Sequence, residues 1–241
     1  MQIYKRGYKP KTIKKVINKK LDEWIESIDD KSLRADLYKN TLVTGGSIAS
    51  MVLGEPVNDF DVYFKNKETV IKVAEYYINK IRNNTSYQVA LDRKIITNIR
   101  GIDEEVISIM VPSAGSLTLI ESENDAENVF DNEDHEYQET DEIAKDLENK
   151  QKYQVAFISP NAITLTDKIQ LVLRLYGEAE QIHKDLDFVH AQGVFDLFTQ
   201  KLTIPNEALL AMTSRTLIYT GSLYPIASLF RSKKFLSRGW G

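Results

Sequence analysis

The sequence contains no cysteine, only three histidines and six prolines among 241 residues, and no long hydrophobic run. Without cysteine the chain has no disulfide, no thiolate nucleophile and no cysteine-based zinc site, which fits a reducing compartment. His135, His183 and His190 are too few and too scattered for a histidine-rich metal site. No stretch of about 18 apolar residues occurs, so we expect no membrane-spanning helix. The basic N-terminal segment lacks the apolar run of a secretory signal, so we expect a cytoplasmic protein.

Acidic side chains are concentrated in one part of the chain. Residues 121–150 contain thirteen Asp and Glu against two Lys, a net charge of −11, whereas the whole chain carries −4. The remaining residues therefore carry +7. We interpret this distribution as a basic body, which suits phosphate-bearing partners, with an acidic surface loop inserted into it.

Hydrophobic periodicity predicts an α/β (α+β) protein built around a mixed sheet. A helical N-terminal segment is expected at residues 1–40, the core at residues 41–200 and a helical tail at residues 201–241. Within the core, helices are expected at 47–53 and 67–82. Strands are expected at 41–44, 59–64, 87–91, 94–99, 105–111, 116–120, 152–158, 162–166, 169–176 and 186–191.

Residues 43–64 read VTGGSIASMVLGEPVNDFDVYF, which places a glycine pair and an aspartate pair close together. In a strand, residues i and i+2 point to the same face, so Asp59 and Asp61 would project together while Phe60 packs into the core. Like charges side by side are tolerated where a divalent cation neutralises them, and Mg²⁺ prefers carboxylate oxygens. Paired metal ions are the usual device for in-line attack on a phosphate, so the pattern predicts two Mg²⁺ ions at Asp59 and Asp61.

Gly45 and Gly46 lie between a predicted strand and a predicted helix. Glycine lets the backbone approach a ligand closely, and a helix that starts near Ser47 would direct free N–H groups at a phosphate. We therefore expect Gly45, Gly46 and Ser47 to bind the phosphates of a nucleoside triphosphate (NTP) whose Mg²⁺ the aspartates hold. Taken separately, the two halves of this pattern are also typical of an ordinary turn and a solvated strand end.

The GGS turn, the spacer and the D-apolar-D strand together resemble the signature of the polymerase-β superfamily of nucleotidyltransferases. GGSIASMVLGEPVNDFD is most similar to the form found in CCA-adding enzymes and poly(A) polymerases of the bacterial type. Those enzymes carry an Arg-Asp pair soon after the glycines, where this chain reads Ile48-Ala49-Ser50. The resemblance, which spans about residues 42–64, therefore implies the nucleotidyltransferase fold and chemistry rather than CCA addition itself.

The same resemblance implies a third carboxylate, from a neighbouring strand, that binds metal and helps to deprotonate the attacking hydroxyl. IQLVLRLYGEAEQIHKDLDFVHA resembles the strand–helix–strand that delivers this group, which makes Asp187 the candidate. Asp185 and Asp196 are the alternatives; we favour Asp187 because an apolar residue flanks it on each side. A strand cap is the purely structural interpretation of Asp187, and a hydrogen-bonded core histidine is that of His190.

The tail, SLYPIASLFRSKKFLSRGW, also resembles that of predicted nucleotidyltransferases encoded by bacteriophages, which implies a host-cytoplasm setting. Aromatic and basic residues interleave there, namely Arg215, Tyr219, Tyr224, Phe230, Arg231, Lys233, Lys234, Phe235, Arg238 and Trp240. Aromatics and arginines together stack bases and grip a nucleic-acid backbone, which makes RNA a candidate acceptor. At helical spacing the same aromatics also suit a hydrophobic core.

Two functions follow from these patterns. The first is a magnesium-dependent nucleotidyltransferase that transfers a nucleoside monophosphate from an NTP to an acceptor and releases pyrophosphate. In it Asp59 and Asp61 hold both ions and Asp187 completes one site. The alternative is a catalytically inactive nucleotidyltransferase-like phage accessory or virion protein that binds nucleic acid or a partner protein.

Overall fold

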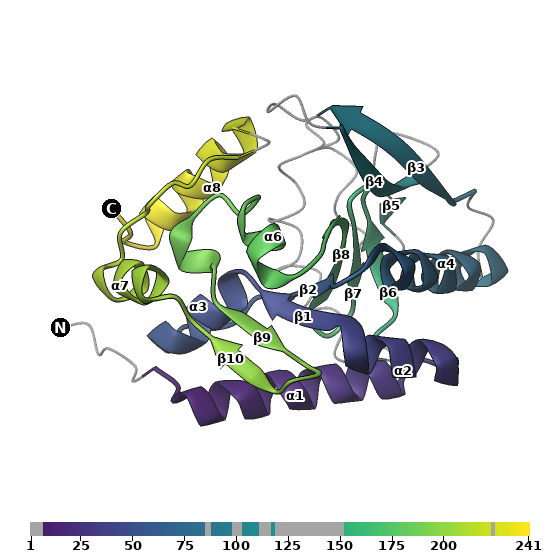
Figure 1. Ribbon diagram of the computed structural model, residues 1–241, viewed down its shortest axis with the longest axis horizontal. Coiled ribbons are helices and arrows are strands. Elements are labelled where there is room, and N and C mark those ends of the chain that lie inside the picture. Colours follow the sequence, from purple (N-terminus) through teal and green to yellow (C-terminus); the bar gives the residue numbers. More distant parts are fainter. Residues whose placement is uncertain (1–6, 85–87, 98–102, 111–116, 119–151, 223–224) are drawn as a thin grey trace.

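The computed structural model describes residues 7–84, 88–97, 103–110, 117–118, 152–222 and 225–241 (Figure 1). The acidic segment 121–150 and Tyr224 lie outside the described residues. None of the helices in the described part of the chain has the length and apolar character needed to cross a membrane.

The described residues form a mixed sheet of eight strands in the order β10-β9-β1-β2-β8-β7-β6-β5. Strands β2 and β8 run parallel, and the other neighbours run antiparallel. The strand bounds are β1 (Thr41–Thr44), β2 (Phe60–Phe64), β5 (Leu117–Thr118), β6 (Val155–Ile158), β7 (Ala162–Leu165), β8 (Ile169–Tyr176), β9 (Val194–Asp196) and β10 (Lys201–Thr203). This architecture confirms the predicted α/β class with a mixed sheet.

A separate two-stranded ribbon, β3 (Ala90–Thr97) with β4 (Asp103–Met110), lies at the upper right of Figure 1. The sequence pattern predicted two strands, 87–91 and 94–99, where the structure has the single strand β3. Every residue of β3 pairs with β4, from Ala90 opposite Met110 to Thr97 opposite Asp103. The charged residues that interrupt the apolar pattern at 92–94 therefore belong to one continuous ladder.

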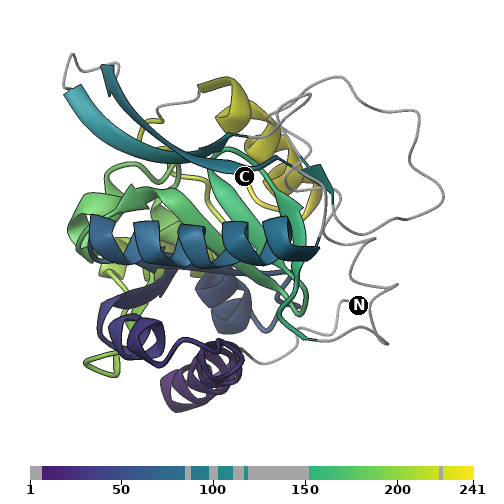
Figure 2. The ribbon, with the colours of Figure 1, turned by 90° about the vertical axis from the view of Figure 1, so that its right-hand side faces the viewer.

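Four helices pack on one face of the sheet: α1 (Pro10–Glu26), α2 (Lys31–Asn40), α3 (Gly46–Leu53) and α4 (Lys67–Asn84). Figure 2 shows α4 across the front of the sheet with α1 and α2 below it. Trp24 of α1 and Tyr77 of α4 are fully buried there, and the indole N–H donates to the tyrosine hydroxyl at 2.8 Å. The predicted N-terminal helical segment thus shares one core with the sheet.

The opposite face of the sheet carries the short helix α6 (Ala179–His183). Leu42, Tyr63 and Val194 form a cluster there with Ile182 of α6. Phe60 and Val62 belong instead to the core under the four helices. Because side chains alternate along a strand, Asp61 projects on the same side as Tyr63, which is the α6 side.

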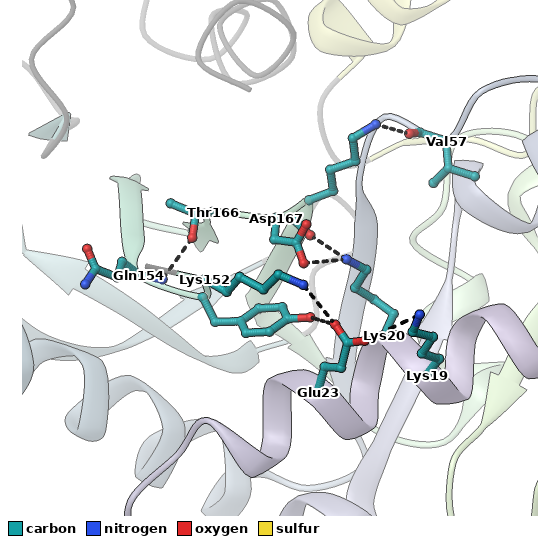
Figure 3. A network of polar contacts seen from close by, with 10 residues as sticks. Lys19, Lys20, Glu23, Val57, Lys152, Gln154, Thr166 and Asp167 are labelled. Carbon is teal, nitrogen blue, oxygen red and sulfur yellow. Dashed lines mark hydrogen bonds and ion pairs between the residues drawn. The ribbon is translucent and has the colours of Figure 1, made fainter. Parts of the chain in front are cut away.

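A polar network ties α1 to the turn between β7 and β8 (Figure 3). Lys20 donates to the Asp167 carboxylate at 2.7 Å, and Glu23 accepts from the Tyr153 hydroxyl at 3.1 Å. The next residue, Lys168, donates through its Nζ to the Val57 carbonyl at 2.9 Å and accepts at its own carbonyl from the Phe60 N–H at 2.8 Å. The network therefore fixes the start of β2, where the two aspartates lie.

The predicted strand at 186–191 is wrong. Residues Val189–Ala191 form a short 3₁₀ helix, η2, and Phe188 makes an isolated bridge to Tyr219. The backbone here pairs with the segment after α7 (Asn206–Ser214) rather than with the sheet: Thr220 N–H donates to the Asp187 carbonyl at 2.8 Å. An apolar run predicts burial, and here the burial is against helices.

The predicted helical tail is present as α7 and α8 (Pro225–Ser237), at the left and upper left of Figure 1, but it begins later than the expected residue 201, because Lys201–Thr203 form the edge strand β10 of the sheet. His190 of η2, 1% exposed, lies among aromatic rings, with centroids 4.4 Å from Trp240 and 4.5 Å from Phe235. Neither ring nitrogen of His190 has a hydrogen-bond partner within the described chain, so the expected hydrogen-bonded histidine is not what the structure shows. Burial, together with the charge of Arg238, lowers the pKa of His190 to about 4.

We predict that His190 makes the protein sensitive to mild acid. Below the ordinary pKa of 6.5 the unfolded chain gains a proton on His190, whereas the folded protein resists it until about pH 4. The unfolding free energy is therefore highest above pH 6.5 and falls as the pH drops from 6.5 towards 4. The loss that His190 causes over this range is at most about 3 kcal/mol. His190→Phe should flatten the pH dependence of the unfolding free energy across this window, measured by urea denaturation. Equal slopes for the variant and the wild type would contradict the assignment.

Candidate functional site

The glycine turn and the aspartate strand lie directly against each other. β1 pairs with β2, Val43 opposite Val62, and α3 begins just after β1. Gly45, which joins β1 to α3, has φ +99° and ψ −155°, a conformation open essentially to glycine alone. A Cβ at Gly45 would lie 2.5 Å from Oδ2 of Asp61. The missing side chain is therefore what lets this carboxylate approach the start of the helix.

Asp61 lies on the side of β2 away from the helical core. Asp59 directly precedes β2, and both aspartates are half-buried, whereas Phe60 and Val62 are buried. This alternation places Asp61 as expected, whereas the expectation that Asp59 projects with it stays a prediction, because Asp59 lies outside the strand. Their role as metal ligands stays a prediction, to which the hard carboxylate donors are suited.

At the start of α3, some but not all of the polar groups are available to bind a phosphate. Ser47 is 3% exposed, and its Oγ has no hydrogen-bond partner among the described residues. A buried hydroxyl without a partner is costly, so a phosphate oxygen would satisfy it. The Gly45 N–H, by contrast, donates to the Ala191 carbonyl at 3.0 Å. Gly46 and Ser47 thus remain the candidates for direct phosphate contact. The contribution of Gly45 is the absence of a side chain, which leaves room for the Asp61 carboxylate.

Asp187 is held by the C-terminal helix. Its side chain is 7% exposed, accepts from the Ser228 hydroxyl at 3.0 Å and forms an ion pair with Arg231, both on α8. Among the alternatives, Asp196 pairs with Lys65 at 2.7 Å. Across the described ranges, no three His, Cys, Asp or Glu side chains are grouped so that they could hold a metal ion. The structure therefore does not gather Asp187 with the aspartates of β2, and its catalytic role stays a prediction.

Two residues that lie beside the site were not identified as candidates from the sequence. Gln170 of β8 is registered with Asp61 on the parallel neighbour and is 3% exposed. Its signal was a single polar residue in the otherwise apolar run 169–173. Nε2 of His183 lies 3.3 Å from the Thr44 hydroxyl, and burial lowers the pKa of this histidine. Sequence spacing carries no signal for that contact, because 139 residues separate the partners.

The basic and aromatic tail is largely engaged within the protein. Besides Arg231, the guanidinium groups of Arg215 and Arg238 each pair with Glu55 at 2.6 Å. The aromatic residues divide: Phe235 and Trp240 pack in the cluster around η2, whereas Tyr219 and Phe230 are 52% and 50% exposed. The core interpretation thus holds for part of the tail.

The contact between Gly45 and Asp61 predicts an unequal response of two glycines. Gly45→Ala and Gly221→Ala both place a side chain at positive φ, +99° and +103°, but a Cβ at Gly221 meets no atom within 4 Å. Both changes should cost about 1–3 kcal/mol of backbone strain. Gly45→Ala should cost at least about 1 kcal/mol more, because it displaces the Asp61 carboxylate. Urea denaturation of both variants measures the difference, and equal losses would show that the contact has no energetic weight.

The Asp187–Arg231 pair predicts coupling between η2 and α8. Arg231→Ala should lower the unfolding free energy by about 2–3 kcal/mol, because it leaves a buried carboxylate without its ion partner. Adding Asp187→Asn should recover part of this loss, since the unpaired charge is then gone. Lys233→Ala, an exposed cation on the same helix, is the control and should change stability by less than about 0.5 kcal/mol. Strict additivity of the two single losses in a double-mutant cycle would exclude the coupling.

The solved structures that are similar to this chain include CCA-adding enzymes. The Thermotoga maritima CCA-adding enzyme complexed with tRNA matches at a TM-score of 0.40 and 10% identity over 89% of this chain and 40% of that one. A CCA-adding enzyme in complex with CTP matches at a TM-score of 0.34 and 11% identity over 90% of this chain and 38% of that one. The chain thus spans about two fifths of the length of these proteins.

Comparison with curated proteins finds no match. Residues 15–215 match the family model described as Gad2, Gabija anti-defense 2 family protein. The matched residues run from α1 to the end of α7 and so include both halves of the candidate site. Because the match covers most of the chain, the protein belongs to the Gabija anti-defense 2 family.

Proposed function

We propose that this protein is a magnesium-dependent nucleotidyltransferase that transfers a nucleoside monophosphate from an NTP to an acceptor. The observation that carries the proposal is the close approach of Asp61 Oδ2 to the Gly45 turn, where a Cβ would lie at 2.5 Å. It joins a carboxylate to the N-terminus of α3. A metal-bound triphosphate needs these two elements side by side, one for the cation and one for the phosphate oxygens.

The residues would divide the work as follows. Asp59 and Asp61 would hold Mg²⁺, which neutralises charge on the phosphates. The N–H groups from Gly46 onward and the Ser47 hydroxyl would bind the β- and γ-phosphates. An acceptor oxygen would form a bond to the α-phosphorus, its proton passing to a base, as the bond from that phosphorus to the bridging oxygen breaks and pyrophosphate leaves. Asp187 would serve as the base only after release from Arg231.

The family name points to the setting of the reaction. An anti-defense protein acts inside the infected cell, so the proposed acceptor belongs to the Gabija defence, in the host cytoplasm. RNA remains a second acceptor class because Lys233 and Phe230 are exposed on α8. Three arginines of the tail are less available to bind RNA phosphates, because Arg215, Arg231 and Arg238 form ion pairs within the protein.

A second function has its own observation. No three-residue metal group is found in the described ranges, and the Asp187 carboxylate is engaged by α8. Both facts favour a nucleotidyltransferase-like protein that binds an NTP or a partner without turnover. The two functions differ in one measurable quantity, the release of pyrophosphate.

We predict Mg²⁺-dependent transfer of label to an acceptor. The protein is incubated with each α-labelled NTP, with and without Mg²⁺, in the presence of either purified Gabija proteins or total RNA, and label and pyrophosphate are followed. Asp61→Asn should abolish transfer while retaining the fold, because an amide keeps the shape and loses the charge. Asp92→Asn, on the ribbon β3–β4, is the control and should retain activity.

The outcomes separate the two functions. Near wild-type turnover by Asp61→Asn would overturn the metal assignment. Binding of NTP by the wild type with no pyrophosphate released, whichever acceptor is offered, would favour the binding protein.

A further inference from the structure

Three adjacent strands place a row of polar residues across the α6 side of the sheet. Asp61 of β2 is registered with Gln170 of β8, and Gln170 is registered in turn with Thr164 of β7. Gln170 and Thr164 are 3% and 8% exposed, and the Thr164 hydroxyl has no hydrogen-bond partner among the described residues. Registered residues on neighbouring strands share one face and lie about 4.8 Å apart. Gln170 is thus the nearest cross-strand neighbour of Asp61 on the β8 side.

The chemistry of this position decides how much negative charge faces a cation at Asp61. Glutamine has nearly the size and shape of glutamate and carries no charge. The candidate site therefore offers two carboxylates, Asp59 and Asp61, while the next position in the row is neutral. Attraction of a divalent cation scales with the charge that faces it, so removing one carboxylate weakens binding substantially. The remaining candidate carboxylate, Asp187, is neutralised by Arg231.

We propose that Gln170 keeps the nucleotide-free protein in a state of low affinity for divalent cations, so that the metal enters together with the triphosphate. The phosphate oxygens of the NTP then supply the negative charge that position 170 does not. This inference rests on the proposed function, because it assigns an order of binding to the same site. In this account Gln170 acts through the charge it lacks beside Asp61, and it is a positioning residue rather than a catalytic one.

The test measures metal binding without turnover. Mn²⁺ is titrated into the nucleotide-free protein by calorimetry and by electron paramagnetic resonance of the unbound ion. Gln170→Glu should bind Mn²⁺ about tenfold more tightly than the wild type, or better, because it adds a charge beside Asp61. Gln170→Leu should stay within about threefold of the wild type, because it leaves the charge unchanged. Gln200→Glu is the matched control: it makes the same chemical change at an exposed position on the β9–β10 turn and should have no effect.

A second arm covers the case in which Gln170→Glu fails to fold, as a melting curve would show. The affinity of the wild type for α,β-methylene-ATP, which cannot transfer its nucleotide, is measured with and without Mn²⁺. Binding should tighten about tenfold or more with the metal, since each requires the other. If the nucleotide-free wild type already binds Mn²⁺ as tightly as in the presence of the analogue, the proposal is overturned. A large loss of Mn²⁺ binding in Asp187→Asn would also overturn it, because Asp187 would then supply the third charge.

Asp61→Asn separates this inference from the proposed function. If Asp61→Asn abolishes Mn²⁺ binding and Gln170→Glu does not strengthen it, the metal site stands and the role of Gln170 is wrong. If Mn²⁺ binding with the analogue does not depend on Asp61, the metal assignment in the proposed function fails as well.

Discussion

The candidate site depends on one steric constraint, the absence of a side chain at Gly45. The chain passes from β1 into α3 through one residue, and the backbone at Gly45 does so at φ +99°. The same residue faces Asp61, so a larger side chain would both strain the turn and displace the carboxylate. Backbone conformation and site geometry are therefore coupled at one position. Under the proposed function, the turn would be required for the site as well as for folding.

The surrounding structure holds this contact from two sides. On one side, Lys20 and Asp167 tie α1 to the β7–β8 turn, and the Lys168 carbonyl receives the first N–H of β2. On the other, Ala191 in η2 accepts from the Gly45 N–H. The Ala191 contact links the glycine turn to the segment that carries Asp187. A rearrangement of η2 would thus reach Gly45 directly, through one hydrogen bond, as well as through Asp187.

Much of the fold could be predicted from the sequence, because periodicity reports which side of an element is buried. The strands at 41–44 and 169–176 and the helices around 47–53 and 67–82 agree with the structure to within two residues. The strand at 186–191 failed because burial against α7 and α8 gives the same apolar pattern as burial in a sheet. The neighbourhood of Asp61 was predictable on the β1 side, where motif spacing is short. It was not predictable on the β8 side, because the register of a strand more than 100 residues away in sequence is set by tertiary packing.

The candidate carboxylates have different charged neighbours. Asp61 lies at the glycine turn, Asp187 is paired with Arg231, and the position registered beside Asp61 is the neutral Gln170. Three clustered carboxylates without a cation would repel one another and lower stability. Gln170, registered beside Asp61, is neutral, and Asp187 is not gathered with Asp59 and Asp61, so neither position adds to the repulsion between those two carboxylates. Under the proposed function, this arrangement favours a stable nucleotide-free protein, and the additional negative charge that a cation needs would come from the triphosphate.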